Sequence, residues 1–69
     1  MSVYKVIEII GTSSQSWEDA ALSAVKTARE SLRDLRVARV IEQDVDLSEG
    51  DAVIYRTKVE VSFKYEGGQ

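Results

Sequence analysis

The sequence of 69 residues contains neither cysteine nor histidine. Without cysteine no disulfide can form, although domains this small often need a disulfide, a metal or partner subunits to be stable. A metal or self-association therefore remains as the source of extra stability. Without histidine or cysteine, and without a phosphate-binding glycine motif, Ser13, Ser14 and Ser16 have no neighbour that could activate them as nucleophiles. We therefore predict that the protein is not an enzyme.

Strong positive charge and long apolar segments are absent as well. The formal net charge is −3 and the sequence pI is about 4.8, whereas nucleic-acid phosphates are bound by clustered lysine and arginine. No apolar run approaches the roughly 20 residues of a membrane span, and the N-terminal residues do not follow the pattern of a signal peptide. We therefore predict a cytoplasmic protein without a nucleic-acid or membrane partner.

The first half of the chain predicts a strand followed by a helix. Residues 3–10 are rich in β-branched and aromatic side chains and are followed by Gly11, a composition that is typical of a strand. Ser16, followed three residues later by Asp19, indicates the start of a helix with a capping box. Apolar residues at spacings of three and four then form one stripe: Trp17, Ala20, Ala21, Ala24, Val25, Ala28, Leu32 and Leu35. The alanines make this stripe flat, so that the helix can lie close against a sheet.

The second half of the chain is typical of two strands. Residues 37–45 and 53–65 are predicted as an antiparallel pair joined by the turn-forming sequence DLSEGD. We therefore predict an α+β fold of order β-α-β-β, in which a three-stranded antiparallel sheet packs on one helix. We assign residues 1–69 to a single domain with a frayed tail at about residues 66–69.

The predicted first strand is apolar on both faces. Its apolar side chains are Val3, Ile7 and Ile9 on one face and Tyr4, Val6 and Ile10 on the other. One helix covers only one face of a three-stranded sheet, and a strand that is apolar on both sides needs cover on both. We therefore predict self-association. The alternative is that Tyr4 and Ile10 are isolated apolar side chains on the surface.

Three segments together resemble the dodecin family over nearly the whole chain. They are VYKVIEIIGTSSQSWEDAALSAVKTARESL, VARVIEQDV and YRTKVEVSFKYEGG, and they keep the order strand, GTS, helix, strand, strand. Dodecins are small proteins that assemble as hollow, roughly spherical dodecamers of cubic symmetry. The resemblance therefore implies a homododecamer, which would supply the partner subunits that the small core requires.

Two positions that match the flavin site of dodecins carry different residues in this chain. Flavin-binding dodecins stack a tryptophan at the start of the second strand on the isoalloxazine ring and bond its polar edge with a glutamine in the last strand. The matching positions are Val37 and Arg56. Valine has no π face, and Trp17, the only tryptophan, is predicted to anchor the start of the helix instead. Flavin is therefore not expected as a cofactor.

Arg56 allows two interpretations. Its guanidinium could hold the phosphate of an anionic nucleotide, or it could form a cross-strand ion pair. If residue 46 faces residue 52 in the hairpin, Glu42 lies opposite Arg56 on one face of the sheet. We predict this ion pair.

Residues 41–55 carry a cluster of acids whose role is open. An EF-hand loop beginning at Asp44 is excluded, because Glu49 stands where glycine is required and Tyr55 where a bidentate glutamate is required. Side chains that alternate along an extended strand place three acids on one face: Glu42, Asp44 and Asp46. Their repulsion can be relieved by a divalent cation, by a basic neighbour or by solvent.

The dodecin resemblance favours calcium as the cation. A branch of the family that lacks the flavin-stacking tryptophan is described as calcium-binding, and MSVYKVI, IIGTS, SWE and VARVIEQD resemble it. Near a threefold axis one carboxylate is presented three times, which gives up to six oxygens, a number that calcium accepts. Our candidate metal ligands are Glu8, Glu42, Asp44 and Asp46. For Glu8 the alternative is an ion pair with Lys5 or an arginine.

The predicted function is a non-enzymatic, dodecin-like hollow dodecamer with calcium bound by carboxylates at subunit contacts. One alternative is a carrier or storage shell for flavin phosphate or a coenzyme A-like nucleotide, held through Arg56. Another alternative is a structural shell without a ligand. The absorbance of the purified protein distinguishes the carrier, because flavins and nucleotides absorb light.

Overall fold

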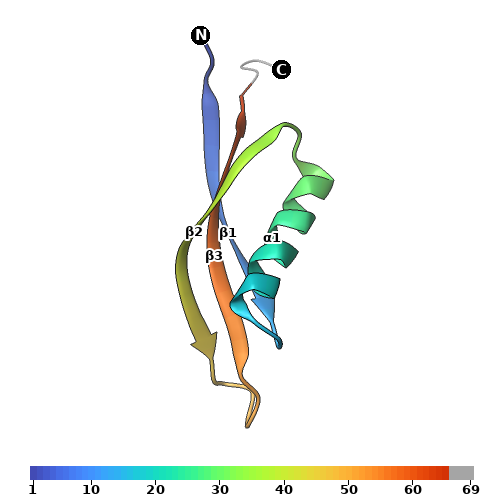
Figure 1. Ribbon diagram of the computed structural model, residues 1–69, viewed down its shortest axis with the longest axis vertical. Coiled ribbons are helices and arrows are strands. Elements are labelled where there is room, and N and C mark those ends of the chain that lie inside the picture. The colour runs from blue at the N-terminus through green and yellow to red at the C-terminus, as the bar shows by residue number, and fades with distance from the viewer. Residues whose placement is uncertain (66–69) are drawn as a thin grey trace.

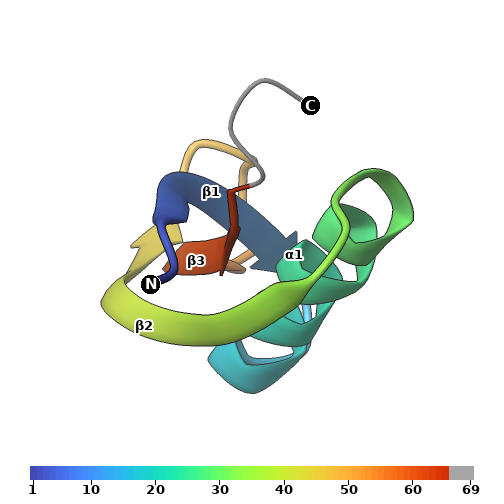
Figure 2. The same cartoon turned by 90° about the horizontal axis from the view of Figure 1, so that it is seen from above.

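The computed structural model describes residues 1–65, and the predicted frayed tail at residues 66–69 lies outside the described residues. The elements are β1 (Tyr4–Ser13), α1 (Trp17–Ser31), β2 (Leu35–Asp46) and β3 (Ile54–Lys64). The strands form one antiparallel sheet in the order β1-β3-β2, so that β3 lies in the middle. α1 lies against one face of this sheet, mainly over β1 and β3 (Figure 1 and Figure 2). The predicted β-α-β-β order and the antiparallel sheet are confirmed.

α1 begins at the predicted position. Ser16 is the N-cap residue with extended backbone, and its hydroxyl oxygen accepts a hydrogen bond from the Asp19 N–H at 3.0 Å. The Asp19 carboxylate accepts a hydrogen bond from the Ser13 hydroxyl at 2.7 Å, and the Ser13 oxygen accepts one from the Gln15 N–H at 2.9 Å. Ser13 thereby connects the end of β1 to the first turn of α1.

The core is small and lies between α1 and the centre of the sheet. Its buried residues on α1 and β3 are Ala20, Ala24, Ala28, Thr57, Val59 and Val61. Gly11 of β1 lies so close to α1 that a Cβ atom there would be 1.9 Å from the carbonyl oxygen of Ala20. The flat alanine stripe and Gly11 therefore allow the close approach of helix and sheet that the sequence predicted.

β1 is longer than predicted. It continues through the GTS segment to Ser13, because Thr12 and Ser13 pair with Arg56 and Tyr55 of β3. These pairs lie far apart in the sequence, and main-chain pairing with β3 overrides the turn-like composition of GTS.

α1 is shorter than the predicted apolar stripe. It ends at Ser31, and Leu32 is its C-cap residue with extended backbone. Leu35, which the spacing had assigned to the helical stripe, is the first residue of β2 and packs against the core from the sheet. No helix within residues 1–65 has the length and apolar character needed to cross a membrane.

The loop between β2 and β3 is two residues longer than predicted. Asp46 lies opposite Ile54 and not opposite residue 52, so residues 47–53 form the loop. The Asp46 carboxylate accepts hydrogen bonds from the N–H and the hydroxyl of Ser48 at 2.8 and 2.5 Å. Gly50 then has a φ of 67°, in the region that favours glycine. These two local turns take up the additional residues.

The observed register changes the cross-strand partners. Asp44 lies opposite Arg56, and Glu42 lies opposite Lys58. The predicted pairing of Glu42 with Arg56 is therefore wrong, and the register differs from the prediction by two residues. The prediction that Arg56 forms a cross-strand ion pair is correct, but the acid is Asp44.

The face of the sheet turned away from α1 carries exposed apolar side chains. Because Thr57, Val59 and Val61 of β3 are buried under α1, the even-numbered residues of β3 and their cross-strand partners face the other way. Four apolar residues on this face are about half exposed, namely Tyr4 at 48%, Val6 at 52%, Ile10 at 50% and Val37 at 60%. We call this surface the open face.

Candidate cation site on strand β2

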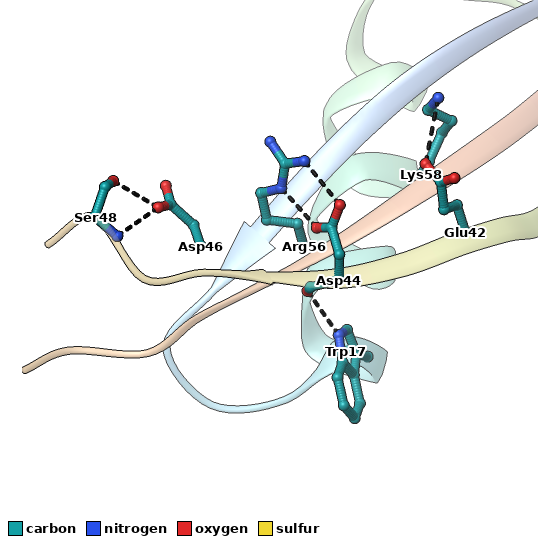
Figure 3. A network of polar contacts seen from close by, with 7 residues as sticks. All are labelled: Trp17, Glu42, Asp44, Asp46, Ser48, Arg56 and Lys58. Atoms are coloured by element: carbon teal, nitrogen blue, oxygen red, sulfur yellow. Dashed lines mark hydrogen bonds and ion pairs between the residues drawn. The ribbon is translucent and has the colours of Figure 1, made fainter.

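Three acids lie in a row along β2 on the open face. Glu42, Asp44 and Asp46 alternate with residues that face α1, and no register shift interrupts the pairing of this segment with β3. Figure 3 shows the three carboxylates on the same side of the strand. The structure therefore has the row of acids that the alternation predicted.

Two of these acids form ion pairs with basic residues of β3. The Arg56 guanidinium donates two hydrogen bonds to the Asp44 carboxylate, from Nε at 2.7 Å and from Nη2 at 2.8 Å (Figure 3). The Lys58 Nζ lies 3.5 Å from the Glu42 carboxylate. The side chains of Asp44 and Arg56 are 45% and 41% exposed, so solvent screens the pair and its contribution to stability is small. Basic neighbours thus relieve part of the repulsion in the single chain.

The geometry lowers the pKa of two acids in the row. The hydrogen bonds from Arg56, and then its charge, hold the pKa of Asp44 below its ordinary value of 3.8. The hydrogen bonds from the hydroxyl and N–H of Ser48 likewise lower the pKa of Asp46. Both side chains are therefore carboxylates at neutral pH, which is the form that binds a cation.

These pKa shifts predict how stability depends on pH. A carboxylate whose pKa is lower in the folded than in the unfolded chain stabilises the fold above the unfolded pKa, and this contribution is lost as the pH falls through the folded pKa. When the pH is lowered below about 4, we expect the melting temperature of the metal-free protein to decrease. The fall should be shallower in Asp44→Asn, as measured by circular dichroism at a series of pH values.

The matched control is Asp51→Asn, which changes an exposed acid of the loop that makes no ion pair within residues 1–65. We expect this variant to follow the pH profile of the wild type. Identical profiles for the wild type and Asp44→Asn would contradict a stabilising role for the pair of Asp44 and Arg56.

Trp17 connects the start of α1 to the acidic strand. Its indole N–H donates a hydrogen bond to the main-chain carbonyl of Asp44 at 3.0 Å (Figure 3). Its ring packs edge-on against Tyr55, with centroids 5.1 Å apart and an interplanar angle of 78°. The hydroxyl of buried Thr57 donates to the main-chain carbonyl of Trp17 at 2.9 Å. The prediction that Trp17 anchors the start of the helix is confirmed.

Glu8 lies on the open face at the centre of β1. It is directly opposite Glu60 of β3, and Glu60 pairs with Arg39 of β2 at 3.1 Å. Within residues 1–65, Glu8 forms no ion pair with Lys5 or with an arginine. The alternative for Glu8, an ion pair at the sheet edge or at a subunit interface, stays a prediction.

The acids do not form a complete metal site within one chain. Among the described residues, no three side chains of His, Cys, Asp or Glu lie close enough together to hold an ion. A hollow of about 80 Å³ is lined by Glu42, Asp44, Arg56, Lys58 and Ile10. The fit of this donor set to calcium is partial, because its carboxylates are suitable ligands while further oxygens have to come from water or a second copy of the chain.

The two positions matched to a flavin site lie far apart on the open face. Val37 is opposite Ser62, and Arg56 lies six residues away from Ser62 along β3, a distance of about 20 Å. Trp17 packs against Tyr55 on the opposite face of the sheet, so its ring cannot take the place of an aromatic side chain at Val37. A ligand that contacts both Val37 and Arg56 would need a second copy of the chain.

The comparison with known families agrees with this architecture. A sequence model of the dodecin family matches residues 3–66. The chain belongs to the dodecin family. The family resemblance that the three sequence segments predicted is thereby confirmed.

Two relatives cover nearly the whole of this dodecin. Calcium dodecin of Mycobacterium tuberculosis is 59% identical over 69 residues, which are 100% of this chain and 97% of that protein. A crystal structure of the M. tuberculosis protein, described as a calcium-chelating immunodominant antigen with a novel calcium-binding site, has a TM-score of 0.87 and covers 99% of this chain and 97% of that chain. Dodecin of Thermus thermophilus is 36% identical over 93% of each chain. The structure of one of its arginine variants has a TM-score of 0.85 over 96% of this chain.

Two features of the site were missed by reasoning from the sequence. The hydrogen bond from Trp17 to the Asp44 carbonyl depends on the position of α1 over the sheet, and no local sequence pattern predicts it. The partners of the acids depend on the hairpin register, which the Asp46 and Ser48 turn had shifted by two residues. The DxS spacing of these two residues is a signal that could have indicated that turn.

Proposed function

We propose that this dodecin is a non-enzymatic subunit of a hollow homododecamer that binds calcium through carboxylates at subunit contacts. The proposal treats residues 1–69 as a single domain and the assembly as a cytoplasmic particle without a nucleic-acid or membrane partner. The observation that carries it is the row of Glu42, Asp44 and Asp46 on the open face. Calcium prefers carboxylate oxygens, and the 59% identical relative is named a calcium dodecin.

Exposed surface supports the proposed assembly. The chain exposes 5202 Å², whereas a compact monomer of 7.7 kDa exposes about 4300 Å². The difference of about 900 Å² is close to the roughly 800 Å² that each partner buries in an interface of standard size. The apolar residues of the open face are suited to this contact, since removing them from water is favourable.

Symmetry would complete the ligand set that one chain lacks. When copies of the chain meet around an axis, each carboxylate of one subunit is brought near its equivalents. Such a cluster of like charges is unfavourable without a cation and favourable with one. Calcium held only by the assembled state would therefore stabilise the dodecamer by mass action, by about 2.7 kcal/mol for each bound ion at a free concentration one hundred times Kd.

We further propose that this chain belongs to the part of the family without the flavin-stacking tryptophan and does not bind flavin. Val37 offers no ring for stacking. The guanidinium of Arg56 is engaged by Asp44 through two hydrogen bonds, which also argues against the alternative role of Arg56 as the phosphate ligand of a nucleotide carrier. A colourless protein without nucleotide absorbance would agree with this proposal.

Native mass spectrometry with and without a calcium chelator tests the proposed function. We expect a particle of twelve chains with additional mass in calcium-sized steps, and we expect chelation to remove these steps and lower the melting temperature. A monomer would refute the assembly, and a dodecamer that is unaffected by chelation would refute the calcium site. Glu8→Gln, Glu42→Gln, Asp44→Asn and Asp46→Asn, tested one at a time, identify the ligands by the loss of bound calcium.

A further inference from the structure

The charges of the chain are separated along the sequence. Residues 26–39 contain five bases and two acids, whereas residues 40–53 contain five acids and no base. The basic segment covers the last turns of α1 and the start of β2, and the acidic segment ends in the loop of residues 47–53 between β2 and β3. The bases and the acids of the loop therefore lie towards opposite ends of the molecule (Figure 1).

Several charges of these two segments have no partner within one chain. Arg29, Arg33 and Arg36 form no ion pair within residues 1–65, and neither does Glu49 of the loop. The arginines and Glu49 cannot reach each other, because β2 lies between them and spans about 30 Å. A second copy of the chain can bring its loop next to the arginines, and opposite charges that meet in this way favour association.

A small hollow lies beside these arginines. It has a volume of about 70 Å³, and its lining includes Val25 and Arg29 of α1 together with Leu35, Arg36 and Ala38 of β2. Both arginines are exposed, whereas Val25 and Leu35 are half-buried. The hollow therefore has apolar walls and positive charge at its edge. Because α1 forms one of its walls, the hollow is separate from the open face.

The loop between β2 and β3 carries a side chain that fits this hollow. Leu47 is the first residue of the loop and is 65% exposed, although the removal of a leucine side chain from water is favourable. It directly follows Asp46 and precedes Glu49 by two residues. An apolar side chain in a pocket, surrounded by polar groups, is a common arrangement at protein–protein interfaces.

We propose that the hollow receives Leu47 from the loop of a second copy of this chain. Glu49 of that loop then faces Arg29 and Arg36. The contact joins two different surfaces of identical chains, and such contacts produce a closed ring when their rotation closes. The proposal rests on the self-association in the proposed function, but it does not depend on calcium.

Disulfide cross-linking of a variant that combines Ala38→Cys and Leu47→Cys tests this contact. The chain has no cysteine of its own. The two positions lie near opposite ends of β2, too far apart for a disulfide within one chain, which requires Cα atoms within about 7 Å. After mild oxidation we expect covalent species of three or more chains on a denaturing gel without reductant. Either single variant has one cysteine and gives at most dimers.

The matched control combines Leu22→Cys with Leu47→Cys. Leu22 is 61% exposed on α1 and lies outside the lining of the hollow. Random collisions would link the two pairs of positions equally, so we expect the larger species only with cysteine at position 38. Equal cross-linking of both pairs, or no cross-linking of Ala38→Cys with Leu47→Cys, would overturn the inference.

Charge reversal tests the ionic part of the contact. We expect Glu49→Arg to raise the protein concentration at half assembly about tenfold, since like charges that face each other across an interface are unfavourable. Sedimentation velocity measures this concentration. Addition of Arg36→Glu to Glu49→Arg should restore assembly, because every reversed loop then meets a reversed hollow. Glu30→Arg changes the net charge by the same amount outside the loop, and an equally weak assembly of Glu30→Arg and Glu49→Arg would contradict the contact.

The oligomeric state of the wild type separates this inference from the proposed function. If native mass spectrometry shows a wild-type monomer, the proposed assembly fails and this contact fails with it. If the wild type assembles but the cysteine pair at positions 38 and 47 does not link, the inference alone is overturned. If the cysteine pair prevents assembly, the charge reversals decide. A linked particle that binds no calcium supports this contact and refutes only the calcium site.

Discussion

Gly11→Ala is expected to destabilise the folded chain by about 3 kcal/mol or more. The new Cβ would lie 1.9 Å from the carbonyl oxygen of Ala20 and 2.9 Å from its carbonyl carbon. Both atoms belong to the main chain of α1, so no side-chain rotation relieves the clash and the whole helix has to move away. Small domains have a free energy of unfolding of only about 5 kcal/mol or somewhat more. Urea titration should therefore show that Gly11→Ala loses a large part of this free energy.

Gly50→Ala separates this steric effect from the general cost of replacing glycine. Gly50 has no atom within 4 Å of the new Cβ, but its φ of 67° disfavours alanine. We expect a loss of about 1 kcal/mol for this variant. A Gly11→Ala variant that loses no more stability than Gly50→Ala would contradict the close contact between β1 and α1.

Val61→Ala should have the second largest effect, a loss of about 2–3 kcal/mol. Val61 is 0% exposed at the centre of β3 and belongs to the cluster with Ala24 and Val59. The substitution removes two buried methyl groups, and the alanines of α1 are too short to fill the cavity. The free energy of unfolding from urea titration measures the loss.

Leu22→Ala is the control for Val61→Ala. Leu22 lies on α1 with 61% of its surface exposed, and leucine and alanine both favour helices. We expect a change within about 0.5 kcal/mol. Equal losses at Leu22 and Val61 would contradict the position of the core between α1 and β3.

Local signals in the sequence were sufficient to predict the elements and their order. The N-cap at Ser16 was correct because the Ser16 hydroxyl and the Asp19 N–H are neighbours in the chain. The last strand was correct because its alternation matches a strand that α1 covers on one face only, with Thr57, Val59 and Val61 buried. These features depend on residues that lie close together in the sequence.

The predictions that failed depended on contacts between distant residues. GTS has the composition of a turn, yet Thr12 continues β1 because Arg56 is available as its partner on β3. The hairpin register was wrong by two residues because the Asp46 and Ser48 turn lengthened the loop. Because of this shift, Arg56 pairs with Asp44 and not with Glu42. The acids were therefore found on the correct face but assigned the wrong partner.

The proposed calcium site is harder to predict from the sequence than the contacts within one chain. Its candidate ligands could be named because acids are rare in apolar strands and because carboxylates bind calcium. Which of them share an ion depends on how copies of the chain meet. The order of strands in one chain does not determine this, and neither does the position of α1.

The position of β3 between β1 and β2 has a consequence for how the protein is made in the cell. Both outer strands have one edge whose N–H and C=O groups are unpaired within residues 1–65. Such edges accept strands from other chains, and β1 with its valine and isoleucine residues is a template for aggregation. Variants that cannot form the proposed assembly are therefore expected to accumulate as insoluble aggregates.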